Sequence, residues 1–308
     1  MTSLRDRYRG SLLGLACGDA VGTTVEFSPR GSFAPVTDMT GGGPFRLKPG
    51  QWTDDTSMAL CLAESLLTKG AFDPADQINR YRNWWQWGYL SSTGSCFDIG
   101  MTVQDALSRY AVTGDPYSGS TNPRSAGNGS LMRLVPAVLF AYPDRARVLQ
   151  SAADSSRTTH GAPEAVQACQ LFAGILCAAL DGQPKSALLA NAGFTPTEAK
   201  LAAMATGAFL AKADSDIRGT GYAVDSLEAA LWCFFHTDSF DAAVLRAANL
   251  GDDADTTAAI TGQLAGAWYG VEGIAPRWLE QISMRADIDD MAQRMFDRFH
   301  EGTCERMA

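Results

Sequence analysis

The sequence is poor in positive charge: 25 Lys and Arg residues stand against 34 Asp and Glu residues, giving its 308 residues a formal net charge of −9. No stretch rich in Lys or Arg offsets this balance. An acidic surface repels phosphate backbones, so we expect no sequence-independent binding to nucleic acids. Hydrophobic residues make up 46% of the chain and charged residues 19%, which is typical of a soluble globular protein rather than a disordered one.

Paired cysteines, a secretion signal and a membrane-spanning run are also missing. The seven cysteines include no C-x-x-C pair, and most lie in apolar segments, as Cys17, Cys169 and Cys177 do. This pattern favours small buried side chains in a reducing compartment over disulfides or a zinc site. The first ten residues lack an apolar stretch ahead of a cleavage site, and the longest apolar run, 168–180, is too short to span a bilayer. We therefore expect a cytoplasmic protein with no membrane partner. We also expect a monomer, on no specific feature of the sequence.

Alternation of apolar and polar residues, the signature of a half-buried strand, does not persist over five or more residues. Helical spacing dominates instead, as in the opening segment, where Leu4, Tyr8, Leu12 and Leu15 recur three or four residues apart. No low-complexity linker divides the chain. The sequence thus predicts an all-α fold in a single domain, 1–308. Segments with the same spacing are 55–67, 74–87, 99–110, 145–158, 163–180, 196–211, 227–235, 240–248, 255–268, 276–282 and 288–299.

Two acidic clusters each precede a strongly apolar helical segment. The first is the run 52–56, Trp-Thr-Asp-Asp-Thr, and the second is 251–257, Gly-Asp-Asp-Ala-Asp-Thr-Thr. Helix capping explains one such cluster, because Thr or Asp at an N-cap accepts backbone N–H bonds and acids suit the helix dipole. The two clusters together carry five Asp residues, which is more than two caps need.

A bound cation is the other explanation for these clusters. Both helices are apolar nearly all round, so their N-termini should lie near the interior, where unpaired carboxylates are costly. Carboxylate and hydroxyl oxygens without His or Cys suit Mg²⁺, Mn²⁺ or Ca²⁺ rather than Zn²⁺. The spacing of a calcium-binding EF-hand is absent. Two clusters of about three ligands each could hold a pair of divalent ions.

Three further features are ambiguous by themselves. Glu26 follows a glycine-punctuated helix and could be a solvated loop acid. The run 127–130, Gly-Asn-Gly-Ser, precedes the apolar segment 131–140 and predicts either a cradle for a phosphate or sugar hydroxyl, or a tight turn in which Ser130 caps a helix. His160 follows a helical segment, where it could stabilise the helix dipole or contact a ligand.

Taken together, these motifs resemble the ADP-ribosylglycohydrolase family. The resemblance covers about residues 8–270 and rests on the order and spacing of four motifs. These are G-x-x-x-G-x-x-x-G-D-A-x-G at 10–22, Thr-Asp-Asp-Thr at 53–56, Gly-Asn-Gly at 127–129 and Gly-Asp-Asp-Ala-Asp-Thr at 251–256. The resemblance implies an orthogonal helical bundle with a central binuclear Mg²⁺ or Mn²⁺ site.

The resemblance also implies roles for individual residues. Asp55, Glu26 and Asp98 are the candidates for activating or positioning water at the scissile ribose. The implied metal ligands are Thr53, Asp54 and Asp55 from the first cluster, with Asp253, Asp255 and Thr256 from the second. The implied contacts to ADP-ribose are Gly127, Asn128, Gly129, Ser130 and His160. The family's last motif often reads G-G-D-T-D-T, so Asp252 and Ala254 are departures at positions that do not bind metal.

The activity implied is metal-dependent hydrolysis of the N-glycosidic bond between ADP-ribose and a modified protein side chain, most simply arginine, with the ADP-ribosylated protein as partner. Two alternatives stay open. A catalytically silent ADP-ribose-binding protein could share the scaffold. An isoprenoid synthase is also all-α and magnesium-dependent, but its D-D-x-x-D motif would need an acid where Met58 or Thr256 stands.

Overall fold

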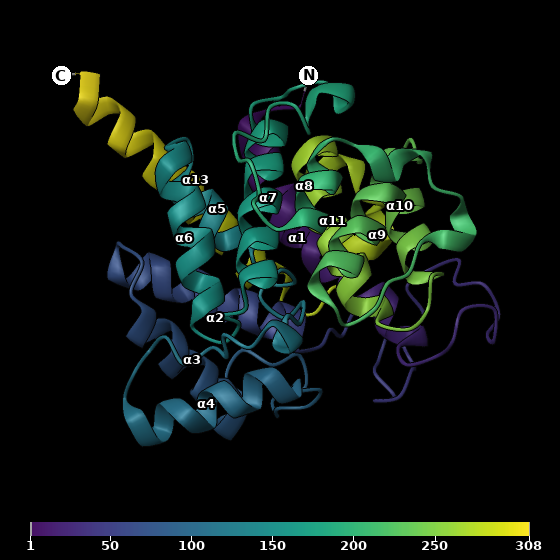
Figure 1. Ribbon diagram of the computed structural model, residues 1–308, viewed down its shortest axis with the longest axis horizontal. Coiled ribbons are helices and arrows are strands. Elements are labelled where there is room, and N and C mark those ends of the chain that lie inside the picture. The colour runs from purple at the N-terminus through teal and green to yellow at the C-terminus, as the bar shows by residue number, and fades with distance from the viewer. Residues whose placement is uncertain (1, 308) are drawn as a thin grey trace.

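The computed structural model describes the backbone of residues 2–307 and the side chains of residues 2–298. Within that part of the chain, helices and turns account for the regular structure, and only isolated β-bridges occur in place of strands. The all-α prediction is therefore confirmed (Figure 1). The α-helices are α1 (Leu4–Gly22), α2 (Asp54–Lys69), α3 (Pro74–Trp87), α4 (Met101–Thr113), α5 (Val135–Ala141), α6 (Arg145–Arg157), α7 (Pro163–Leu180), α8 (Ala199–Ala205), α9 (Ala223–Phe235), α10 (Phe240–Ala248), α11 (Ala254–Tyr269), α12 (Pro276–Gln281) and α13 (Arg285–Met307).

Most predicted helices agree with the structure to within a few residues. The predicted segment 288–299 is longer in the structure, where α13 ends at Met307, and two other segments differ for local reasons. The segment predicted as one helix over 196–211 is broken: α8 ends at Ala205, and Gly207, with φ of 81°, precedes a short 3₁₀ turn. The apolar segment 131–140 becomes helical only at Val135, the residue before Pro136. Proline suits the first turn of a helix but cannot donate a hydrogen bond farther inside one.

The centre of the molecule is the contact between α1 and α11, which lie side by side (Figure 1). Glycines at every fourth position of α1 face small residues of α11. A Cβ atom built on Gly10 would lie 2.5 Å from the carbonyl oxygen of Gly266, and one on Gly18 would overlap the carbonyl oxygen of Ala258. The backbones therefore touch directly, which side chains would prevent. This contact fixes where α11 begins relative to the end of α1.

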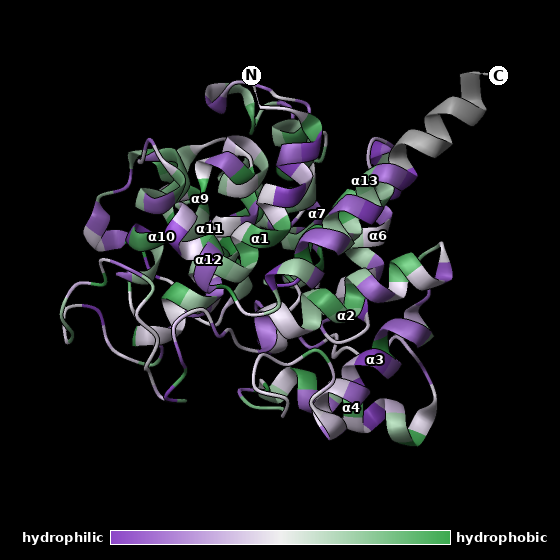
Figure 2. Cartoon of the chain, turned by 180° about the vertical axis from the view of Figure 1, so that it is seen from behind, coloured by the Kyte–Doolittle hydropathy of each residue, from purple (hydrophilic) through white to green (hydrophobic). Residues whose placement is uncertain are grey.

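Other helices cover this pair and bury its apolar surface. Seen from behind, hydrophobic residues are frequent along α1, α9 and α11, whereas hydrophilic ones are frequent on α3 and α13 (Figure 2). A second apolar cluster joins α2, α3 and α4 through Met58, Tyr81 and Leu107, and it supports the loop 95–100. As predicted, the cysteines in apolar segments are buried and unpaired, Cys17, Cys169 and Cys177 among them. The side chain of Cys304 lies outside the described residues.

Helix α7 is long and apolar enough to cross a membrane by length and composition, although the sequence prediction considered only its run 168–180. In the fold, 78% of this helix is buried against the rest of the chain. A core helix of a soluble protein passes the same test, so α7 is weak evidence for a membrane span.

We expect Gly18→Ala to destabilise the protein strongly, because the added methyl group would overlap the backbone of Ala258 and force α1 away from α11. The expected loss in the free energy of unfolding is about 2–4 kcal/mol, measurable by urea denaturation. Gly100→Ala is the control, since a Cβ there meets nothing, and it should cost less than about 1 kcal/mol. Equal losses in the two variants would contradict the direct backbone contact.

Candidate metal and ligand site

A fully buried carboxylate from α1 organises the N-terminus of α2. Asp19 Oδ1 accepts hydrogen bonds of 2.9 Å from the backbone N–H and from the hydroxyl of Thr53. Its Oδ2 accepts bonds from the backbone N–H and the hydroxyl of Thr56, at 3.0 and 2.6 Å. Burial raises the pKa of Asp19 to about 6, while these four donors act in the opposite direction. Asp19 is not among the predicted site residues, although a lone acid in the apolar stretch Leu-Ala-Cys-Gly-Asp-Ala-Val was a signal of a buried role.

The part of the capping explanation that assigns an N-cap side chain to each cluster is wrong, although Asp54, Asp55 and Asp255 do lie in the first turns of their helices. Neither Thr53, at the N-cap of α2, nor Asp253, at the N-cap of α11, uses its side chain to cap its own helix. The α2 terminus is capped by Asp19 instead. The side chains of the two clusters are thus directed to other partners.

The two helix N-termini meet, although about 200 residues of sequence separate them. The hydroxyl of Thr53 lies 3.3 Å from Asp255 Oδ2, and the hydroxyl of Thr256 lies 3.2 Å from Asp55 Oδ1. Asp253 accepts a 2.7 Å bond from the side-chain amide of Asn128. The fold therefore gathers both clusters into one buried group.

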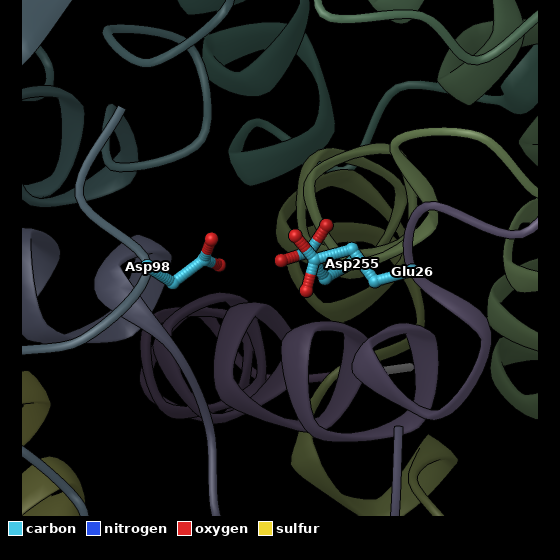
Figure 3. A group of neighbouring side chains, drawn as sticks. All are labelled: Glu26, Asp98 and Asp255. Atoms are coloured by element: carbon cyan, nitrogen blue, oxygen red, sulfur yellow. The ribbon is translucent and has the colours of Figure 1, made fainter. Parts of the chain in front are cut away.

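Two loop acids join this group. Glu26 follows the end of α1, and Asp98 comes from the loop before α4, on the opposite side of the group (Figure 3). One carboxylate oxygen from each of Glu26, Asp98 and Asp255 lies within 4.8 Å of the others, which is close enough to share a cation. Glu26 is buried, so its interpretation as a solvated loop acid is wrong.

The electrostatics of the group strongly oppose ionisation of all its members. Loss of hydration raises the pKa of Glu26, Asp54, Asp55 and Asp255, and the neighbouring carboxylates raise it further. Burial, followed by the charges of Asp19 and Asp253, raises the pKa of Asp98 to about 7. Among the described residues, none of the ion pairs brings Lys or Arg to these acids.

The unpaired oxygens of this group fit a divalent cation. Glu26 Oε2, Asp55 Oδ2 and Asp255 Oδ1 are buried without a hydrogen-bond partner, and such atoms are rare in native proteins unless an ion or water satisfies them. Carboxylate and hydroxyl oxygens are the ligands of Mg²⁺ and Mn²⁺. These residues are therefore suited to hold the metal that the sequence predicted.

A cavity of about 940 Å³ opens beside the acidic group. Its lining includes acids and no Lys or Arg, together with Gly127, Asn128, Gly129 and His160. Within the described residues, the backbone N–H of Gly129 makes no hydrogen bond, which leaves it free to bind an acceptor in the cavity. The acids that line the cavity are Glu26, Asp54, Asp98, Asp252, Asp253 and Asp255.

The structure corrects two interpretations of the glycine-containing loop. Ser130 does not cap a helix, because α5 begins at Val135 with Leu134 at its N-cap. The hydroxyl of Ser130 is also turned from the cavity: it lies 2.9 Å from Ser156 Oγ and 3.3 Å from Cys169 Sγ, and Ser130 is not among the lining residues. Its predicted contact with a ligand through the side chain is therefore not supported.

Backbone strain concentrates at this cavity. Three lining residues other than glycine have left-handed backbone conformations: Phe27, Asp98 and Asp252, with φ of 60°, 58° and 56°. L-residues adopt this region at an energetic cost, and such strain often marks functional sites. The positive φ of Asp252 also explains why glycine often occupies this position in the family's motif, since glycine adopts the left-handed conformation without strain.

The fold and the cavity define an all-α protein with a buried, oxygen-rich group suited to divalent cations. The chain belongs to the ADP-ribosylglycohydrolase family, which it matches over residues 1–304. This membership rules against the isoprenoid synthase alternative.

Individual relatives are similar over nearly the whole chain. An ADP-ribosylarginine hydrolase Tri1 of Pseudomonas putida is 46% identical over 293 residues, covering 95% of this chain and 78% of the relative. The ADP-ribosyl-[dinitrogen reductase] glycohydrolase of Rhodospirillum rubrum is 35% identical, covering 92% and 93%. A solved structure described as an ADP-ribosylglycohydrolase-related protein complex is 45% identical, with a TM-score of 0.84, covering 96% and 98%.

We expect the metal-free protein to become less stable as pH rises from about 5 to about 8. The folded state raises the pKa of the clustered carboxylates, that of Asp98 to about 7, so it binds more protons than the unfolded state over this range. Stability is then greatest at low pH and falls as the acids ionise. Melting temperatures measured in the presence of a chelator should fall as the pH rises. With Mg²⁺ or Mn²⁺ added, they should rise with pH instead.

Asp255→Asn should weaken both the pH slope and the stabilisation by metal, since it removes one clustered charge and one ligand oxygen. Asp105→Asn, an exposed acid of α4, should change neither. A flat pH profile in chelator together with no response to either cation would contradict the site.

Proposed function

We propose that this protein is a metal-dependent hydrolase that releases ADP-ribose from ADP-ribosylated arginine side chains of proteins. The observation that carries this proposal is the convergence of Glu26, Asp98 and Asp255 in a cavity that also carries uncharged hydrogen-bond donors at the loop 127–129 and His160. Family membership and the names of relatives at 42–46% identity support the same activity.

The polarity of the cavity suits this substrate. An ADP-ribosylated arginine has a cationic guanidinium group at one end and an anionic diphosphate toward the other. The acids that line the cavity match the guanidinium by charge. The backbone N–H of Gly129, which lines the cavity and makes no hydrogen bond within the described residues, suits a diphosphate oxygen. Serine-linked ADP-ribose lacks the cation and so lacks this charge match.

Hydrolysis breaks the bond between C1″ of the distal ribose and the guanidinium nitrogen, and it forms a bond from C1″ to a water oxygen. A carboxylate among Glu26, Asp55 and Asp98 would accept the proton of that water, and the departing nitrogen takes up a proton. The neighbouring negative charges stabilise the positive charge that develops at C1″. The products are ADP-ribose and unmodified arginine.

The cation would be held by Thr53, Asp54 and Asp55 on one side and by Asp253, Asp255 and Thr256 on the other. Asp19 would position Thr53 through the hydrogen bonds to its backbone and hydroxyl. A divalent ion there supplies Lewis acidity and a fixed attachment point for ribose hydroxyl groups. We further propose a pair of Mg²⁺ or Mn²⁺ ions. The monomeric state, the single domain and the cytoplasmic location stay predictions.

The decisive variants are Asp55→Asn and Asp253→Asn, which keep side-chain size but remove a ligand charge. Release of ADP-ribose from an arginine-modified protein should fall by about 100-fold or more in each, measured by chromatography in Mg²⁺ and in Mn²⁺. Asp105→Asn should retain the activity of the unchanged protein. Undiminished release in either cluster variant would contradict the proposed metal site.

A panel of substrates separates the alternatives for the unchanged protein. Arginine-linked ADP-ribose should be released and serine-linked ADP-ribose should not. Preferential release from serine would contradict the proposed linkage. Binding of ADP-ribose without release from any substrate would identify a silent binding protein.

A further inference from the structure

Arg133 lies just after the glycine-containing loop and is fully buried, yet none of its polar contacts is to a carboxylate in the described part of the chain. Its guanidinium lies over the ring of Tyr81 at 4.6 Å. Its shortest hydrogen bond, 2.6 Å, runs from Nη2 to the hydroxyl oxygen of Thr159. Longer bonds of 3.3 and 3.4 Å reach Ser155 O and Thr158 Oγ1. A guanidinium buried against a hydroxyl fixes which hydrogen bonds that hydroxyl accepts and which it donates.

The direction follows from counting protons. Arginine can only donate, so Thr159 Oγ1 is an acceptor toward Arg133. The single proton of this hydroxyl then needs an acceptor of its own, and His160 Nδ1 lies 2.8 Å away. No other acceptor contacts this hydroxyl among the described side chains. Thr159 therefore donates to Nδ1, and the ring proton of His160 resides on Nε2.

The protonated edge of His160 faces the loop of the cavity. A Cβ atom built on Gly127 would lie 3.3 Å from Nε2, and one on Gly129 would lie 2.8 Å from Cε1. Glycine at both positions thus leaves this edge of the ring uncovered. His160 lines the cavity, and its Nε2 has no hydrogen-bond partner within the described residues. Burial, followed by the charge of Arg133, lowers the pKa of His160 to about 3, so the ring stays neutral.

We propose that Arg133 and Thr159 are positioning residues that hold His160 in its Nε2–H form, so that this N–H donates a hydrogen bond to an oxygen of the ADP-ribose moiety. The choice of ligand rests on the proposed function, whereas the arrangement of the three side chains does not. Neither Arg133 nor Thr159 lines the cavity, so both act only through His160.

Nitrogen-15 NMR of the intact protein at neutral pH tests the arrangement without any substitution. The His160 ring should show a protonated Nε2 and an unprotonated Nδ1 that accepts a hydrogen bond. A protonated Nδ1 in the unchanged protein would overturn the proposal, whatever the activity of the protein.

Thr159→Val removes the hydroxyl but keeps the shape of the side chain. The His160 signals should shift toward a mixture of the two neutral forms, and the dissociation constant for ADP-ribose, measured by calorimetry, should rise about tenfold, the value of one hydrogen bond. Thr159→Ser restores the hydroxyl and should rescue both readouts. Thr158→Val is the matched control: it removes a hydroxyl from Arg133 but none from His160, and it should leave the His160 spectrum unchanged.

The outcomes separate this inference from the proposed function. Unchanged ADP-ribose affinity in Thr159→Val, despite mixed ring forms, would overturn the role of the N–H donor. Identical His160 spectra in Thr159→Val and Thr159→Ser would overturn the proposed chain of hydrogen bonds from Arg133 through Thr159 to His160. An unchanged protein with the Nε2–H form that binds ADP-ribose but releases none would support the inference and contradict the proposed hydrolase activity.

Discussion

The site depends on direct backbone contact between α1 and α11. Glycines four residues apart on α1 let the two helices approach more closely than any side chain permits, from Gly10 against Gly266 to Gly22 against Ala254. Because the pair is held so closely, Asp19 at the end of α1 and Asp255 at the start of α11 both come within hydrogen-bond distance of Thr53. Larger residues at these glycine positions would push α1 and α11 apart, and the carboxylates of Asp19 and Asp255 would no longer lie close together.

The fold concentrates negative charge where burial makes it most costly. Hydrogen bonds from Thr53 and Thr56 satisfy both oxygens of Asp19, and Asn128 satisfies one oxygen of Asp253. One oxygen each of Asp55 and Asp255 has no partner in the described chain. Left-handed backbone at Asp98 and Asp252 adds strain beside them. Such local costs are typical of sites kept for chemistry rather than for stability. The extensive apolar core around α1 and α11 is what allows the fold to sustain them.

The cavity also combines two kinds of recognition. Its acids suit cations, while the loop offers the backbone N–H of Gly129 and the uncovered edge of a neutral His160. Neutral donors bind phosphate oxygens without attracting the metal-binding acids into ion pairs, as Lys or Arg would do. The proposed ADP-ribosylated arginine spans both kinds of environment. Arg133 supports His160 from within the core without entering the cavity.

The sequence by itself determined the helical class and most helix boundaries, because these follow from local periodicity, and the side-chain chemistry of its acidic clusters predicted a site for a hard cation. It also pointed to the family through the spacing of four motifs. Tertiary structure alone decided that Asp19 caps α2, that Ser130 turns from the cavity and that Glu26 is buried. It likewise revealed the chain of contacts from Arg133 to His160. These features depend on atoms brought together from distant segments, and no local pattern in the sequence encodes the direction in which a side chain points after the helices pack.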